Sequence, residues 1–371
     1  MSLIKSYENV FIQAPYLHAS VSSKRMMFDV FLMLILTCIS AVILFGLKVF
    51  FILAIGIMMA FICAYFIKLQ DRSFFMSSFA WINGVLILIL MLPVTVSWFI
   101  PILGVLLYFF NYLVFKIKSH QIFHPALLAK LILYLLFPSV ISEKPPTLFQ
   151  IMNQYSVNWL QANSILFNQD FARAADSTPS LWGIFWGNLA GNMGETSLIL
   201  LLISLFYLGI CNVFFILILL IYLGTLFLLT VVFSGFLNKN LFSLDMFNFL
   251  FQNGTLFFSV FILSYFGTQP ILISRKIWAA FLSAVGIFIL KIQGIWLAQI
   301  VIFLLMGAIT PIFDIWPNHP YFGYQKNMIE EKYYFSWNIF IDKIKSHSFH
   351  LVIALCIMIT IYLLNILSTA I

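Results

Sequence analysis

The chain has 371 residues, of which 63% are hydrophobic and only 8% are charged. Soluble domains carry about 25% charged residues, so this composition cannot cover a water-exposed surface. The net charge of +7 is spread over short segments between long apolar runs, which argues against nucleic-acid binding and is typical of a polytopic membrane protein in a lipid bilayer.

Five apolar runs precede the first long polar segment. A helix that crosses a bilayer needs about 20 mostly apolar residues. We therefore expect transmembrane helices over 26–46, 48–68, 74–95, 98–115 and 122–142. The first 25 residues have neither the apolar segment nor the cleavage site of a secretory signal, so we expect the chain to enter the membrane through its first span.

A polar segment over 143–180 follows, and then the pattern repeats. Five further spans are expected over 196–212, 214–236, 246–267, 276–292 and 295–315. A second polar loop over 316–348 precedes an eleventh span at 349–369. Both sets of five contain proline breaks, at Pro93 and Pro125 and at Pro270 and Pro311, and paired broken helices indicate an internal repeat with a site at its interface.

The predicted fold is all-α, with ten core transmembrane helices in two inverted five-helix repeats plus an extra C-terminal helix. Residues 1–142 form the first repeat with a cytoplasmic N-terminus, and 143–195 form an outward-facing loop and a glycine-rich segment. Residues 196–315 form the second repeat, and 316–371 form a cytoplasmic loop and the extra helix. This orientation places thirteen Lys and Arg residues inside and five outside, as the positive-inside rule requires.

Ionisable residues within spans are candidates for function because burying them in lipid is costly. Asp29, Asp314 and Glu195 lie near predicted helix ends, where interfacial placement or helix capping is the favoured interpretation. Lys130 lies deeper in its span. Snorkelling of its long stem and a buried ion pair are both open for this residue.

The glycine-rich stretch before residue 198 has two interpretations. Gly183, Gly187 and Gly191 are four residues apart and would let another backbone approach one helix face. Alternatively, the segment Gly191-Asn192-Met-Gly194-Glu195 directly precedes an apolar helix, whose free N–H groups would suit an anionic or ring-bearing ligand. The sequence shows no catalytic cluster, metal-ligand set or dinucleotide fingerprint.

Several short segments, all in the same order, resemble the RnfD and NqrB subunits of the Rnf complex and of sodium-pumping NADH:quinone oxidoreductase. They are Ala14-Pro-Tyr-Leu-His18 with Met27-Phe-Asp29, Gln121-Ile-Phe-His-Pro-Ala126, Thr178-Pro179, Gly191-Asn-Met-Gly-Glu-Thr-Ser197, Gly267-Thr-Gln-Pro270, Ser274-Arg-Lys276 and Thr310-Pro-Ile-Phe-Asp314. Each motif is weak alone, but seven in register carry the resemblance.

The resemblance implies an electron-transfer subunit of a redox-driven, cation-translocating complex in the bacterial inner membrane. It implies partner subunits of the Rnf or NADH:quinone oxidoreductase type. It implies FMN esterified through its phosphate to Thr178, with a second flavin, riboflavin or FMN, near Gln121 and His124. The residues Gly191, Asn192, Gly194 and Glu195 would then belong to the cofactor-binding region.

The sequence departs from the family pattern at the cofactor motifs. The segment ending at Thr178 reads Ala172-Arg-Ala-Ala-Asp-Ser-Thr, without the leading Asp and the Gly-Ala pair of the flavin-attachment motif. Gln121 and His124 replace the two Asn residues of the second flavin turn. A second hypothesis is therefore a flavin-free transporter or channel on the same scaffold, with its site at the proline-broken helices.

The predicted orientation can be tested at Gln161, in the loop expected to face outward. A single cysteine introduced there should react with an impermeant maleimide added to intact cells, because the reagent reaches only the outer side. Labelling that occurs only after lysis would overturn the orientation.

Overall fold

The computed structural model describes the residues that form the apolar body of the chain. These are 23–70, 79–117, 120–121, 123–138, 185, 192–211, 216–236, 250–251, 254–265, 268–270, 273–293, 295 and 297–313. The described part is helical apart from one two-residue antiparallel ribbon, which pairs β1 (Lys116–Ile117) with β2 (His120–Gln121).

The first half of the described chain contains five helices, which are α2 (Ser23–Phe45), α3 (Leu47–Gln70), α5 (Ala80–Leu90), α6 (Phe99–Val114) and α7 (Pro125–Leu136). Gly46 separates α2 from α3 with a φ of 79°, and its N–H donates to the Val42 carbonyl at 2.8 Å. Glycine adopts this left-handed conformation without steric penalty, which allows the tight turn between two long helices.

The second half also contains five helical segments. They are α11 (Leu198–Ile210), α12 (Ile216–Phe236), α14 (Thr255–Phe258) with its π-helical continuation η2 (Ser259–Leu263), α15 (Ile273–Ile292) and α16 (Ala298–Phe313). A described helical segment thus lies at each span expected in the two halves. The eleventh expected span, 349–369, lies outside the described residues.

Three helices are shorter than the sequence predicted. The helix predicted over 74–95 ends at Leu90, and the helix predicted over 122–142 is α7, which ends at Leu136. Pro93 and Pro138 follow these ends, and helices usually end at or before the residue preceding a proline. The helix predicted over 246–267 is interrupted at Gly254, whose φ is 72°, and η2 ends at Leu263.

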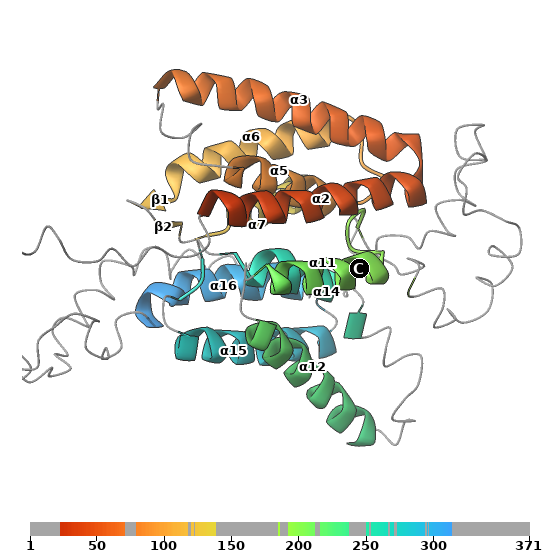
Figure 1. The fold of residues 1–371 in the computed structure, drawn as a ribbon, viewed down its shortest axis with the longest axis vertical. Helices are drawn as coiled ribbons and strands as arrows, with labels where there is room; N and C mark the ends of the chain where they lie inside the picture. The colour runs from red at the N-terminus through yellow and green to blue at the C-terminus, as the bar shows by residue number, and fades with distance from the viewer. Residues whose placement is uncertain are drawn as a thin grey trace, which may run out of the picture.

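The two halves form two adjoining layers whose helices lie side by side (Figure 1). In each half the second helix packs on the fourth and the fourth on the fifth, which gives the pairs α3–α6 and α6–α7 in one layer and α12–α15 and α15–α16 in the other. Between the layers, the first helices α2 and α11 meet, and so do the fifth helices α7 and α16. This matching pattern favours a two-fold repeat, and its inverted orientation stays a prediction.

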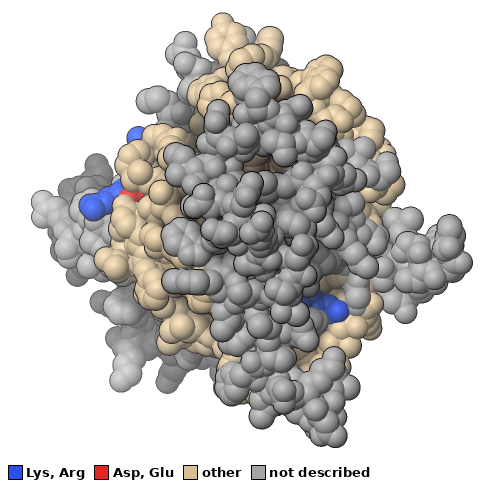
Figure 2. All heavy atoms as spheres, turned by 90° about the vertical axis from the view of Figure 1, so that its right-hand side faces the viewer, with Lys and Arg blue, Asp and Glu red and all other residues tan. Residues whose placement is uncertain are grey.

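Within the described residues, four helices are long and apolar enough to cross a membrane, Lys24–Phe45, Leu47–Ile67, Ile216–Phe233 and Ile273–Ile292. Helix α3 shows how they are adapted to lipid, because Phe51 and Phe66 are 59% and 62% exposed while Ala60 and Ala64 are fully buried. Few charged atoms appear among the described residues in Figure 2. The chain is therefore a multi-pass membrane protein.

Close packing of α5 against α6 depends on Gly84. A Cβ atom built there would overlap the hydroxyl of Tyr108, a side chain that is 2% exposed. Gly224 in α12 differs, because a Cβ there meets no atom within 4 Å.

These two glycines form a matched pair for a packing test. Gly84→Ala should lower the stability of the detergent-solubilised protein by about 1–3 kcal/mol, because Tyr108 has little room to move. Gly224→Ala should be neutral or stabilising by up to about 1 kcal/mol, because alanine favours helix. Thermal unfolding in detergent measures both, and equal behaviour of the two variants would contradict the packing described here.

Candidate functional site

A turn in front of α11 closes the open end of α5. The N–H of Gly194 donates to the Leu90 carbonyl at 2.8 Å, and the N–H of Met193 donates to the Leu92 carbonyl at 3.1 Å. A helix end leaves carbonyl groups without partners inside the helix, and lipid offers none. A Cβ on Gly194 would lie 2.7 Å from the Leu90 Cβ, so this approach requires glycine. The backbone of the second half therefore completes a helix of the first.

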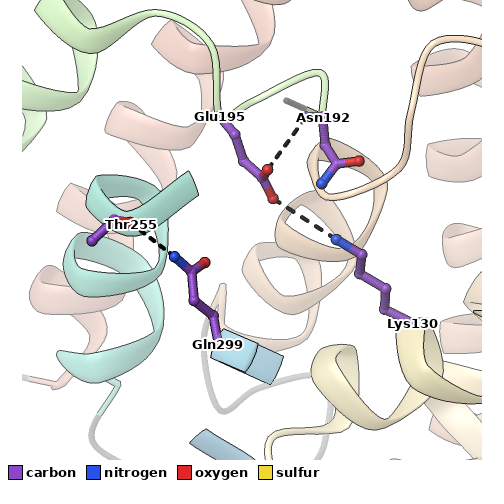
Figure 3. A network of polar contacts seen from close by, with 5 residues as sticks. All are labelled: Lys130, Asn192, Glu195, Thr255 and Gln299. Atoms are coloured by element: carbon purple, nitrogen blue, oxygen red, sulfur yellow. Dashed lines mark hydrogen bonds and ion pairs between the residues drawn. The ribbon is translucent and has the colours of Figure 1, made fainter. Parts of the chain in front are cut away.

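The same turn carries Glu195 into the interior. Its Oε1 lies 3.8 Å from the Nζ of Lys130 in α7, and its Oε2 accepts the N–H of Asn192 at 3.3 Å (Figure 3). The side chains of Lys130 and Glu195 are 5% and 1% exposed. For Lys130 the structure thus shows a buried pair rather than snorkelling. Glu195 was expected to lie at the membrane interface or to cap a helix. It is buried instead, although its acceptance of the Asn192 N–H is the kind of local hydrogen bond that a capping residue makes.

The geometry makes the Lys130–Glu195 pair sensitive to the loss of either member. At 3.8 Å the two charges attract one another, but the contact is too long for a hydrogen bond. Lys130 gains a further contact from the Phe258 ring, whose centroid lies 5.9 Å from its Nζ. Removing one partner of a buried pair leaves an uncompensated charge, at a typical cost of about 3–5 kcal/mol.

A second group of polar side chains meets at Thr255, the first residue of α14. Its Oγ1 accepts hydrogen bonds from the Nζ of Lys291 and from the Nε2 of Gln299, both at 2.9 Å (Figure 3 shows the latter). Lys291 also donates to the Leu250 carbonyl at 3.3 Å. The preceding residue, Gly254, touches the Glu195 side chain, because a Cβ there would lie 2.5 Å from the Glu195 Cδ.

Together these residues form one polar network, defined as Lys130, Asn192, Glu195, Thr255, Lys291 and Gln299. It draws side chains from α7, α14, α15 and α16 and from the turn before α11. The sequence analysis did not identify Thr255, Lys291 or Gln299. Lys291 and Gln299 could have been found from the sequence, because each is a polar residue within or beside a long apolar run. Because α7 and α16 pack on each other, the network lies where the two halves meet.

His124 lies at another place on the same helix pair. It precedes the first residue of α7, is 3% exposed, and packs edge-on against the Tyr265 ring with centroids 4.7 Å apart. Neither of its ring nitrogens has a hydrogen-bond partner in the described part of the chain. It lines a pocket of about 30 Å³ whose other polar walls are Thr268, Gln269, Ser283 and Thr310, and we call this the His124 pocket.

The His124 pocket does not fit the second flavin implied by the resemblance. Ring-bearing ligands occupy pockets of roughly 300–1,000 Å³. The volume of about 30 Å³ is close to the space that one water molecule fills. Gln121 lies in β2, and its side chain is not among the described ones.

The remaining predicted residues are distributed as follows. Thr178, Gly191 and Asp314 lie outside the described residues. Asp29 lies in α2, is 6% exposed, and its Oδ2 has no hydrogen-bond partner within the described chain. No group of three or more His, Cys, Asp or Glu side chains that could hold a metal ion occurs among the described residues.

A protein-family model matches most of the chain. Residues 10–323 match the model of a family described as the NQR2, RnfD, RnfE family. This range includes both halves, the turn before α11 and the whole polar network. No curated protein matches the chain.

The buried ion pair predicts a characteristic pattern in a double-mutant cycle. Lys130→Met alone and Glu195→Gln alone should each destabilise the protein by about 3–5 kcal/mol, because each leaves one charge buried. The double variant removes both charges and should recover most of that loss. Unfolding of the four proteins in detergent measures the coupling, and strictly additive effects would show that the two charges do not interact.

Proposed function

The chain belongs to the NQR2, RnfD, RnfE family, and on this premise we propose that it is the RnfD-like subunit of an electron transport complex, passing electrons through covalently bound FMN. The family match makes it a membrane subunit of an ion-translocating complex. The RnfD-like assignment rests on the motifs that resemble RnfD and NqrB and stays part of the proposal.

The buried Lys130–Glu195 pair is the observation that carries the ion-translocating part of the proposal. Ionisable side chains inside a membrane are costly, face the protein interior, and mark ion pathways. Here a cation from α7 and a carboxylate from the turn before α11 meet between two packed halves. Such an interface is where a relative movement of the halves would change which side the charges face.

The cofactor proposal places FMN on Thr178 as a phosphoester. Thr178 precedes Pro179, lies in the loop predicted to face outward, and comes about a dozen residues before the turn that carries Glu195. Bound FMN would supply the electron-transfer chemistry, and the protein would supply its position and electrostatic environment. Asp176 places a negative charge two residues from the hydroxyl, so attachment requires a transferase that tolerates this altered motif.

Partner subunits follow from what the chain does not carry. Its sequence contains no dinucleotide fingerprint and no cysteine spacing of the iron–sulfur type, so oxidation of NADH and electron transfer through clusters would belong to other subunits. We place the complex in the bacterial inner membrane, with the N-terminus of this chain in the cytoplasm.

A flavin-free transporter or channel is the second candidate. The observation that favours it is the His124 pocket, which has room for about one water where the resemblance implies a flavin. The altered residues before Thr178 point the same way.

Thr178→Val separates the two candidates. We expect wild-type protein co-expressed with its flavin transferase to show an added FMN mass by intact-mass spectrometry and in-gel flavin fluorescence after denaturation. The valine variant keeps the side-chain shape, lacks the hydroxyl, and should lose both signals. Ser177→Ala, which removes the neighbouring hydroxyl, should retain them. An unmodified wild-type protein would contradict covalent FMN and leave the transporter as the leading candidate.

A further inference from the structure

Buried polar groups lie at two levels along the contact between α7 and α16. His124 directly precedes α7 and Lys130 lies within it, six residues further, which corresponds to about 9 Å along the helix axis. On α16, Gln299 and Thr310 are eleven residues apart, or about 16 Å. Gln299 belongs to the polar network, and Thr310 lines the His124 pocket. The contact between α7 and α16 thus holds buried polar side chains at two positions along its length. The polar network lies at one of them and the His124 pocket at the other.

The imidazole of His124 is the unsatisfied group at that end. Its side chain is buried, lines the pocket, and has no hydrogen-bond partner at either ring nitrogen within the described chain. Three of the side-chain donors around it are already engaged, and one is the Gln269 amide, which donates to the Leu263 carbonyl. The Thr310 hydroxyl donates to the carbonyls of Thr268 and Met306, and the Ser283 hydroxyl donates to Ala280. The hydroxyl oxygens of the wall keep free lone pairs, so a small molecule that both donates and accepts fits here.

The chemistry of the walls favours water over a metal cation. Sodium, magnesium and calcium prefer shells of oxygen ligands, whereas an imidazole nitrogen suits transition metals held by several side chains. No cluster of that kind occurs in the described part of the chain. A neutral imidazole presents one donor and one acceptor, which match the hydrogen bonds of water, and a polar pocket of this volume holds about one molecule.

We propose that His124 and a water molecule in its pocket form a proton-relay site between the two halves. The inference rests on the proposed function and names the proton as an ion that the complex moves. A proton carried by the water bonds to the unprotonated ring nitrogen. The N–H bond at the other nitrogen breaks as its proton passes to a lone pair of a second acceptor oxygen, that of a neighbouring water or hydroxyl group. The ring is left as its other tautomer, its charge is unchanged, and no electron is transferred.

The surroundings suit a group that does not stay charged. Among the described residues that line the pocket, none is Asp, Glu, Lys or Arg, and the titratable side chain that faces the ring is Tyr265. Helices α15 and α16 contribute Ser283 and Thr310, which do not ionise at neutral pH. Lys130 lies in α7 about one and two-thirds turns after His124 and pairs with Glu195. Within the described residues a lasting imidazolium would have no carboxylate beside it, whereas exchange between tautomers needs none.

The test uses the whole complex, reconstituted into liposomes that contain a pH-sensitive dye, in sodium-free buffer. Electron transfer should drive a pH change in the wild type. His124→Asn keeps hydrogen bonds to water but cannot relay a proton, so protons moved per electron should fall by about tenfold or more. Ser204→Ala, a buried hydroxyl of α11 outside the pocket, serves as the control and should match the wild type.

Each outcome decides a different claim. A pH change that requires sodium, or an unaltered proton-to-electron ratio in His124→Asn, would overturn the relay. Absence of any ion transport in the wild type would instead contradict the proposed function. Should the variant fail to assemble, water-edited solid-state NMR of the wild-type complex with ¹⁵N-labelled histidine decides. We expect magnetisation to transfer from water protons to the His124 ring nitrogens, and the absence of this signal would refute the site.

Discussion

A carboxylate buried among apolar helices is stable only beside a positive charge, and the Glu195–Lys130 pair supplies that charge from the other half of the protein. Glu195 reaches Lys130 because the adjoining Gly194 is hydrogen-bonded to the end of α5. The position of this turn fixes the start of α11 and brings Glu195 against Gly254, which directly precedes α14. The need to pair the buried Glu195 charge therefore holds the end of α5, in the first half, and the start of α14, in the second half, against the same turn.

Two sets of buried polar side chains lie along the contact of α7 with α16. Lys130 and Gln299 belong to the polar network at one level, and His124 and Thr310 share a pocket at the other. Other buried polar side chains lie elsewhere, among them Asp29 in α2, Asn83 in α5 and Asn111 in α6. In a membrane protein such polar groups are retained where ions or protons pass, which is consistent with the family to which the chain belongs.

The long helices were predictable from the sequence because a helix that crosses a bilayer needs about 20 mostly apolar residues, and this pattern is easily recognised. The helix predicted at 214–236 is α12, Ile216–Phe236, and the helix predicted at 26–46 is α2, Ser23–Phe45. The break at Gly254 was missed, although the polar run Gln252-Asn253-Gly254-Thr255 contains an Asn-Gly turn signal where the backbone turns. The partners within the polar network were also hidden, because Lys130 and Glu195 are 65 residues apart and Thr255 resembles any other threonine.

The most direct test of this account is a distance measurement between the Lys130 Nζ and the Glu195 side-chain carboxyl carbon in membranes. Rotational-echo NMR on chain labelled with ¹⁵Nζ-lysine and ¹³Cδ-glutamate should show a short internuclear contact, consistent with the 3.8 Å between Nζ and Oε1. This signal should disappear in Glu195→Gln. A spectrum without such a contact, or one that the substitution leaves unchanged, would contradict the pairing on which the arrangement of the two halves depends.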